Sequence, residues 1–238
     1  MAVKMSRNLT LRINWVLDQL VPPIIRDAKW FMYMPLNMAF KNKKHLFFNF
    51  KNDVNKITEK EFIKYYEDAE SVNIERPTDL NNECIDLIME NLKGKKVLEI
   101  AVGRGYMAKK IHEAGHNVTA GDIIINDELK SNNPDIKFVE TNIENMPFED
   151  KEFDSVVCTH TLEHVLDFQA AVRELRRVGK RLIICVPKQR PYKYTFDFHV
   201  HFFPYLFSFL LAMGKKENEV TCINAGGDIF YVEDVATK

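Results

Sequence analysis

From residue 96 onward, short apolar runs alternate with segments whose apolar residues recur at helical spacing. Five runs have the length and composition of buried strands: Lys96–Ala101, Asn117–Ala120, Ile136–Glu140, Asp154–Cys158 and Arg181–Val186. Helical spacing predicts helices around and between them, at Thr78–Leu92, at Tyr106–Glu113 and after Asp167. Because strands that alternate with helices form parallel sheets covered on both faces, residues 76–238 are predicted to be a doubly wound α/β domain.

Residues 1–75 show a less regular pattern, which we interpret as a helical N-terminal extension or cap. Leu9–Leu20 has the spacing of an amphipathic helix, and Pro22-Pro23 interrupts it. Thr58–Glu61 has the spacing of a capping box, so a helix is expected from there to about Ala69. Aromatic residues between these helices are interleaved with lysines. They would pack on a core or bind an anionic or sugar-like partner.

The C-terminal part adds a predicted closing hairpin, with strands at Glu219–Ile223 and Ile229–Val232, and a buried helix at Pro204–Met213. Before that helix, polar and apolar residues alternate from Phe196 onward. In an extended segment, Asp197, His199 and His201 would share one face. The side chains on such a face would deprotonate the hydroxyl group of a substrate or hold a metal ion. Alternatively, the face would be the half-exposed side of a strand with no catalytic role.

Composition narrows the class of protein. The 238 residues contain 46% hydrophobic residues and carry a net charge of −1, which argues against a general nucleic-acid binder. The four cysteines are widely spaced, so we expect reduced core residues in a cytoplasmic protein. No signal peptide is expected. The uncharged stretches Trp30–Phe40 and Phe198–Gly214 are too short or too polar to predict a membrane span.

The candidate chemistry centres on the sequence KVLEIAVGRGY at Lys96–Tyr106. A buried strand ends at Glu99 and Ile100 and leads through Gly103 and Gly105 into a helix. Glycines there allow positive φ and the close approach of a ligand, and the helix directs free amide groups at it. The loop is therefore predicted to bind a nucleotide-type ligand. Asp122, after the second strand, can accept hydrogen bonds from both hydroxyls of a ribose.

Two ligands remain open at this point. The spacing Gly103-x-Gly105-x-x-Ala108 fits the dinucleotide fingerprint, which would make the protein an NAD-dependent sugar epimerase or reductase. An acid at Glu99 favours a cationic ligand over a pyrophosphate.

An ordered set of motifs over residues 95–186 resembles class I S-adenosylmethionine (SAM) methyltransferases of the small-molecule, type 11-like kind. The set comprises Glu99-x-Ala101-x-Gly103-x-Gly105, Asp122, Asn142–Phe148, Phe153-Asp154 and Leu162–Val165. Ala101 and Asn142 depart from it, because the family has Gly and Asp there. The resemblance implies a Rossmann-like, seven-stranded, mainly parallel sheet, with an antiparallel last strand inserted beside the fifth.

The resemblance also implies roles for individual residues. The SAM site would comprise Glu99, Ala101, Gly103, Gly105, Asp122, Ile123, Asn142, Ile143 and His160, with Tyr66 closing over the cofactor. Ile123 would flank the adenine, Asn142 and the Ile143 amide would hydrogen-bond to it, and His160 would line the methionine end. His164 is interpreted as fixing a turn or contacting the acceptor.

The expected reaction is direct transfer of the methyl group to an oxygen or nitrogen of a small acceptor, with S-adenosylhomocysteine (SAH) as product. His199 or His201 is the candidate base, and Asp197 and Arg190 are candidate acceptor contacts. The acceptor would be a sugar or phosphorylated intermediate of surface-glycan (polysaccharide) biosynthesis. The alternatives are a quinone- or lipid-type acceptor and a non-catalytic partner subunit with this fold. The sequence leaves the oligomeric state open.

Overall fold

The computed structural model describes residues 7–69 and 76–236, which fall into two compact units. The sheet unit comprises Pro77–Lys188 and the described residues from Phe203 onward. The N-terminal unit comprises the described residues up to Arg76 together with Gln189–Phe202. The predicted division into two domains, with the boundary between residues 75 and 76, stays a prediction. The segment Gln189–Phe202, which that prediction assigned to the second domain, makes its contacts mainly with the N-terminal helices.

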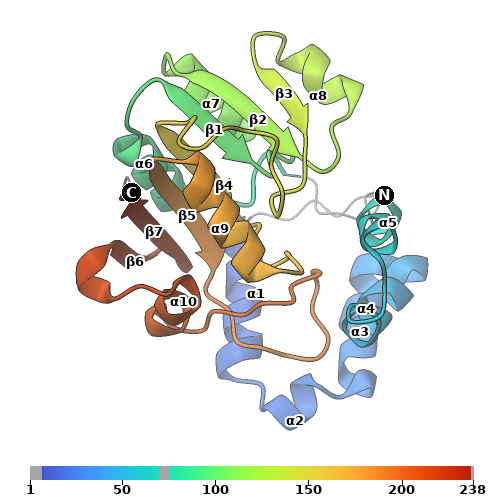
Figure 1. Cartoon of the computed structure of the whole chain (residues 1–238). Coiled ribbons are helices and arrows are strands. Elements are labelled where there is room, and N and C mark those ends of the chain that lie inside the picture. Colours follow the sequence, from blue (N-terminus) through green and yellow to red (C-terminus); the bar gives the residue numbers. More distant parts are fainter. Residues whose placement is uncertain (1–6, 70–75, 237–238) are drawn as a thin grey trace. The chain divides into compact units, whose positions relative to one another are not determined.

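The sheet unit is built on one seven-stranded sheet with the order β3-β2-β1-β4-β5-β7-β6 (Figure 1). The strands are β1 Lys96–Ile100, β2 Asn117–Asp122, β3 Lys137–Glu140, β4 Ser155–Thr159, β5 Arg181–Pro187, β6 Thr221–Ala225 and β7 Asp228–Asp234. The first five strands are mutually parallel, whereas β7 runs antiparallel to both β5 and β6. This arrangement confirms the predicted fold class, including the inserted last strand.

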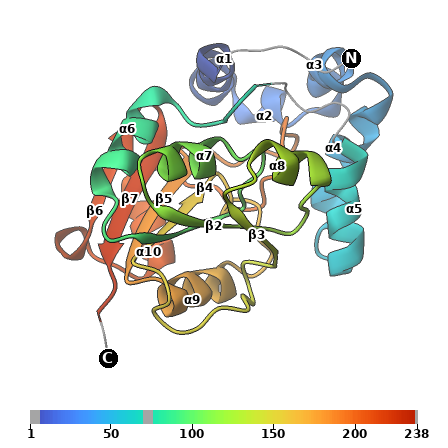
Figure 2. The ribbon, with the colours of Figure 1, turned by 90° about the horizontal axis from the view of Figure 1, so that it is seen from above.

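Helices cover both faces of this sheet, as Figure 2 shows from above. The helices are α6 Asn82–Asn91, α7 Tyr106–Glu113, α8 Asp127–Asn132, α9 Phe168–Val178 and α10 Leu206–Met213, with a short turn of helix at Glu217–Glu219. Strand residues alternate between the faces. In β5, Leu182 and Ile184 pack towards α9 and α10, and Ile183 packs towards α6 and α7. This alternation buries the sheet between two apolar layers. Polar groups that could contact a ligand are therefore expected at the ends of the strands.

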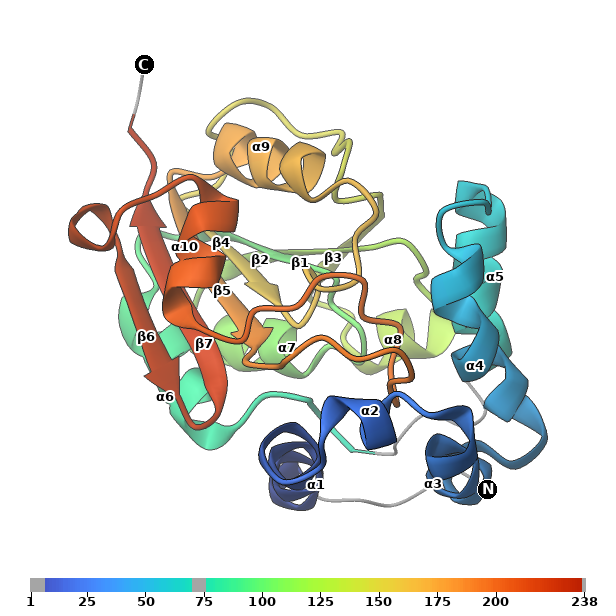
Figure 3. The same cartoon turned by 90° about the horizontal axis from the view of Figure 1, so that it is seen from below.

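The N-terminal unit is helical, which confirms the predicted extension. Its helices are α1 Arg7–Gln19, α2 Pro23–Arg26, α3 Lys29–Phe40, α4 Lys44–Asp53 and α5 Glu59–Ala69, with a helical turn at Lys41–Lys43. The predicted capping box is present: the Thr58 amide donates to Glu61 Oε2 at 2.8 Å, and the Glu61 amide donates to Thr58 Oγ1 at 3.4 Å. Figure 3 shows α1, α2 and α3 following one another in this unit.

The core of the N-terminal unit is an aromatic cluster that also takes side chains from Gln189–Phe202. Phe198 lies with its ring centroid 4.8 Å from that of Phe47 and 4.7 Å from that of Phe50. The predicted extended segment forms neither helix nor strand, although Phe196, Phe198 and Val200 of its predicted apolar face do pack in this cluster. The physical reason is that aromatic packing on α4 and α5, rather than a strand partner, fixes this backbone.

Two smaller features differ from the expectations. The helix α8 was not predicted. The helix α10 is only half buried, since Phe207 and Leu211 are exposed. The four cysteines are free and buried, as predicted. Across residues 7–69 and 76–236, no helix has both the length and the apolar character needed to cross a bilayer.

Candidate functional site

The loop between β1 and α7 turns through three left-handed residues. Ala101, Gly103 and Gly105 have φ values of 60, 51 and 77. A Cβ added to Gly103 would meet no atom within 4 Å, whereas one at Gly105 would lie 2.8 Å from Leu129 Cδ1. Gly103 therefore presents bare backbone to open space, and Gly105 lets the loop pack closely on α8. Ala101 adopts the same backbone conformation at the cost of a Cβ clash with its own main chain.

Glu99 lies beneath this loop rather than on its surface. Its side chain is 3% exposed and accepts a hydrogen bond from the Ala108 amide, one of the free amides of the first turn of α7. Burial raises the pKa of Glu99 to about 8, and the nearby Asp122 also raises it. At neutral pH the side chain is therefore largely protonated. The charge argument against a dinucleotide accordingly loses its force, and Glu99 holds the start of α7.

Asp122 ends β2 beside the same loop. Its Oδ2 accepts a hydrogen bond from the Gly103 amide at 2.8 Å, and its Oδ1 accepts one from Ile124 at 3.4 Å. Burial raises the pKa of Asp122, while these amides act against the shift. Each carboxylate oxygen has a further lone pair, so the group can still accept from a ligand's hydroxyls. Ile123 follows in the chain and is half-buried, as a wall beside such a ligand would be.

The predicted adenine segment forms a compact turn after β3. Asn142 Oδ1 accepts from the Glu144 amide at 2.9 Å, and the Asn145 amide donates to the Asn142 carbonyl at 3.1 Å. Ile143 is buried between them. The Asn142 side chain thus shapes the turn, and the oxygen predicted to contact adenine is already engaged by the backbone.

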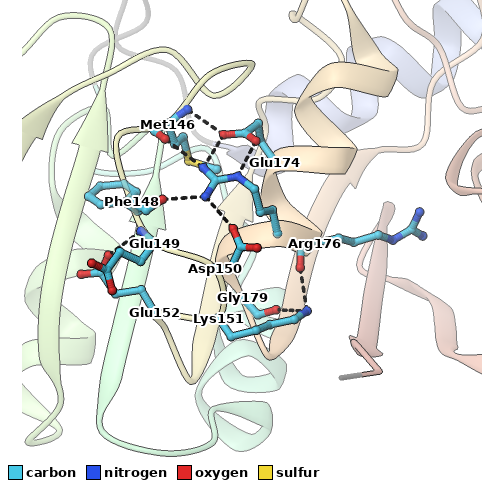
Figure 4. A network of polar contacts seen from close by, with 10 residues as sticks. Met146, Phe148, Glu149, Asp150, Lys151, Glu152, Glu174, Arg176 and Gly179 are labelled. Carbon is cyan, nitrogen blue, oxygen red and sulfur yellow. Dashed lines mark hydrogen bonds and ion pairs between the residues drawn. The ribbon is translucent and has the colours of Figure 1, made fainter. Parts of the chain in front are cut away.

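Figure 4 shows how α9 holds the continuation of this turn. The guanidinium of Arg177 donates to the carbonyls of Met146 at 2.9 Å and Phe148 at 2.6 Å. Arg177 Nε also donates to Glu174 Oε1 at 2.7 Å. The other carboxylate oxygen of Glu174 accepts from the Met146 amide. This network fixes residues 146–150 in position relative to the sheet.

A buried polar cluster at the end of β4 surrounds His160, which has φ 49. Its Nδ1 lies 3.4 Å from Glu163 Oε1, and its Nε2 lies 3.5 Å from Asp228 Oδ2. Asn81 donates to the same Asp228 oxygen at 2.9 Å. Glu163 and Asp228 have no exposed surface. The imidazole is thus placed between two buried carboxyl groups at this edge of the sheet.

Sequence reasoning missed Glu163, Asp228 and Asn81. Glu163 stands inside a motif that the sequence indicated, but only its neighbours His160 and His164 were assigned roles. Asp228 and Asn81 carried no signal, because the fold alone brings β7 and the start of α6 together. His164 donates its amide to the Thr161 carbonyl at 2.8 Å and has Nε2 3.9 Å from Glu163 Oε1, which fits the turn-fixing interpretation.

The remaining predicted residues belong to the N-terminal unit. These are Tyr66, Arg190, Asp197, His199 and His201. Tyr66 packs in the aromatic cluster, with its ring centroid 5.3 Å from that of Phe198. Arg190 donates to the Asp18 carbonyl at 3.4 Å. The roles given to these residues remain predictions.

The surroundings of His199 select one tautomer. Its Nδ1 lies 2.6 Å from Gln189 Oε1, and the amide nitrogen of Gln189 donates to the Tyr192 hydroxyl at 2.7 Å. With the Gln189 amide in this orientation, its oxygen accepts from Nδ1–H, and Nε2 of the neutral ring is the basic nitrogen. Asp197 Oδ2 lies 3.4 Å from Nδ1, so the structure does bring Asp197 and His199 together.

The sheet order and the glycine loop beside Asp122 define the Rossmann-like fold of class I SAM-dependent methyltransferases. Residues 98–184 match the family model for the methyltransferase domain. The predicted resemblance to this family is thereby confirmed over this part of the chain.

Two relatives and one solved structure illustrate the similarity. The chain is 32% identical over 87 residues to a demethylmenaquinone methyltransferase of Corynebacterium urealyticum, covering 37% of this chain and 38% of that protein. It is 28% identical over 163 residues to a protein of the same name from Beutenbergia cavernae, covering 60% and 65%. The matched part is thus less than two thirds of either relative.

The solved structure shares the fold. It is the 1,6-didemethyltoxoflavin-N1-methyltransferase of Burkholderia thailandensis, which was crystallised with 1,6-didemethyltoxoflavin and SAH. It aligns with a TM-score of 0.53 at 18% identity, and the alignment covers 75% of this chain and 87% of that one.

Proposed function

We propose that the protein binds SAM at the carboxyl edge of the sheet unit and transfers its methyl group to a small-molecule acceptor. The observation that carries the proposal is the pairing of Gly103 with Asp122: bare backbone faces open space beside a carboxylate that the loop holds in place. Asp122 would accept from the ribose hydroxyls, and the Ile143 amide would donate to the adenine ring. When bound, SAM supplies an activated methyl group, so the chain's main task is to position an acceptor.

The polar cluster around His160 would suit the amino-acid end of SAM. Glu163 and Asp228 are fully buried and place carboxyl oxygens 3.4 and 3.5 Å from the imidazole nitrogens. Carboxyl oxygens would accept hydrogen bonds from the ammonium group of a ligand, whereas the pyrophosphate of a dinucleotide has no donor to offer them. The preference for SAM over NAD therefore rests on these two acids rather than on Glu99.

An acceptor oxygen would need a base, and His199 supports that role better than His201 does. The bond to Gln189 leaves Nε2 of His199 as the basic nitrogen. The acceptor class is a separate proposal. Support for a sugar or phosphate acceptor is limited to basic residues such as Arg190, which is already engaged by Asp18. The names of the two relatives favour the quinone-type alternative.

Calorimetric titration with SAH and with NAD tests the cofactor. We expect SAH to bind, and Asp122→Ala to weaken binding roughly 10- to 100-fold, as the loss of a charge-assisted hydrogen bond would. Asp127→Ala is the matched control, because this acid is exposed in the first turn of α8. Binding of NAD in place of SAH would overturn the proposal.

Turnover is tested separately with a panel that contains sugars, sugar phosphates and demethylated quinones. Methylation of a quinone alone would select that acceptor class, and methylation of a sugar would restore the glycan hypothesis. SAH binding without turnover on any acceptor would identify a non-catalytic partner subunit. If His199 is the base, His199→Gln lowers kcat and removes its acid limb, whereas His201→Gln leaves the pH profile unchanged.

A further inference from the structure

Exposed large hydrophobic side chains are concentrated in the first three helices. Of the sixteen such side chains in the described residues, nine lie between residues 9 and 38: Leu9, Trp15, Val16, Leu20, Ile24, Trp30, Tyr33, Met34 and Met38. Single exposed apolar residues are ordinary, but nine of them over three successive helices and the turn after the first are not. All of them belong to the N-terminal unit.

The helix α3 shows the pattern most clearly. Met32 and Leu36 face the core and have no exposed surface, whereas Trp30, Met34 and Met38 are 74%, 68% and 73% exposed. At 100° per residue these three fall on one side of the helix, opposite the buried pair. The helix is thus apolar on both sides, and its outer side carries large apolar groups where a surface helix normally carries charges.

The charge around this stripe has one sign. Residues 28–52 contain no Asp or Glu, and they contain the lysines Lys29, Lys41, Lys43, Lys44 and Lys51. Lys29 and Lys41, at the two ends of α3, are exposed. Lys44 is half-buried, and its Nζ lies 5.4 Å from the ring centroid of the exposed Tyr33. A long cationic side chain in this position can direct its head group away from an apolar layer.

We propose that the outer side of α3 binds to the surface of an anionic lipid bilayer and lies in its interface. The twelve residues of α3 span about 18 Å, well below the roughly 30 Å of a bilayer core, so the helix lies on the membrane rather than crossing it. Trp30 and Tyr33 are the side chains that favour the headgroup region, and the lysines complement its negative charge. The proposal is independent of the proposed function.

The charge also argues against a second copy of the chain as the occupant. In a symmetric dimer through this surface, α3 and its lysines would face an identical set, with no acid between residues 28 and 52 to pair with them. Like charges across such an interface are unfavourable. An anionic lipid surface has neither problem.

Tryptophan fluorescence can report membrane binding directly. The chain has two tryptophans, Trp15 and Trp30, and both are exposed. In the Trp15→Phe variant, Trp30 alone reports. We expect its emission to shift to the blue on addition of vesicles made of equal parts phosphatidylcholine and phosphatidylglycerol. The protein should sediment with those vesicles, and pure phosphatidylcholine should bind it far more weakly. High salt should reduce binding, because lysine–lipid attraction is screened.

Two variants test the stripe and the charges separately. Met34→Ser/Met38→Ser and Lys41→Glu/Lys43→Glu should each lower vesicle affinity roughly tenfold or more. Leu211→Ser, at a 74% exposed position of α10 in the sheet unit, is the control and should leave it unchanged. All five positions are exposed or partly exposed, so the variants should keep the wild-type circular dichroism spectrum.

The proposal is overturned if Trp30 emission and sedimentation are insensitive to anionic vesicles. It is also overturned if sedimentation velocity shows a dimer that Met34→Ser/Met38→Ser dissolves while vesicle affinity is unaffected, because the stripe is then a protein interface.

Discussion

At the scale of single residues, Ala101 occupies a backbone conformation that costs a residue with a side chain about 1–2 kcal/mol. Its φ of 60 is one that glycine adopts freely. We predict that Ala101→Gly raises the free energy of unfolding by about 0.5–1 kcal/mol, after glycine's greater loss of chain entropy is subtracted. Urea denaturation measures the change. Ala108→Gly, inside α7, should instead destabilise by about 1 kcal/mol, and equal effects of the two variants would contradict the argument.

Glu99 gives the protein a pH dependence of known sign. Its folded-state pKa is about 8 against an ordinary value of 4.5, so the folded protein keeps a proton that the unfolded chain has lost. The stabilisation linked to this proton is complete below pH 4.5 and is lost as the pH rises through 8. We predict that unfolding free energy falls by a few kcal/mol between these limits, on the order set by a shift of this size.

Glu99→Gln removes that titration and keeps an oxygen that can accept from the Ala108 amide. Urea unfolding at a series of pH values should give a flatter profile for the variant, with its advantage over the wild type largest near pH 8. Because burial also raises the pKa of Asp122, Asp122→Asn separates that contribution. If the unfolding free energies of the wild type and Glu99→Gln depend on pH in the same way, the pKa of Glu99 is not raised by folding and the argument is wrong.

At the scale of elements, α9 holds the loop that leads from the predicted adenine segment to β4. Arg177 makes this connection through the carbonyls of Met146 and Phe148. We predict that Arg177→Gln lowers the unfolding free energy by roughly 2–3 kcal/mol, because several hydrogen bonds to a charged group are lost at once. It should also weaken SAH binding. Urea denaturation and calorimetry measure the two effects.

The control for this prediction is Arg173→Gln on the same helix. Arg173 is exposed, so the substitution changes the charge by the same amount without touching the loop. If both variants weaken SAH binding equally, the effect is electrostatic and the loop is not positioned by α9.

Periodicity predicted most of the strands and helices, because each buried strand or amphipathic helix shows its own pattern of apolar residues. The exceptions have physical reasons. α8 is short and has only Leu129 buried, so it shows no period. The irregular backbone of Gln189–Phe202 depends on the aromatic residues of a distant part of the chain.

At the scale of the whole molecule, the sequence predicted the loop and Asp122 of the candidate site but not the acids around His160. A glycine turn and a strand-end acid are local features with a recognisable spacing. Asp228 reaches His160 because β7 is inserted antiparallel beside β5, and no local pattern in the sequence identifies this pairing. This part of the candidate site thus comes from topology.

The same dependence on distant contacts governs the N-terminal unit, in which Phe198 joins a late segment to α4 and α5. Its ring lies within 6 Å, centroid to centroid, of those of Phe47, Phe50, Tyr65 and Tyr66. We predict that Phe198→Ala lowers the local unfolding free energy by about 3–5 kcal/mol, since it leaves a cavity among packed rings. Hydrogen exchange should rise in α3–α5 and in Gln189–Phe202, and amides of β1, β4 and β5 should keep their protection.

Phe209→Ala is the matched substitution in the sheet unit, where Phe209 packs against Phe203 and Tyr231 with centroids 5.0 and 5.5 Å apart. It should raise exchange in α10 and β7 and leave α3–α5 protected. This reciprocal pattern is expected if the two units unfold independently, because each cavity then weakens only the core in which it lies. If Phe198→Ala instead exposes the sheet to the same extent, Gln189–Phe202 is an integral part of the sheet unit, and the chain unfolds as a single cooperative body.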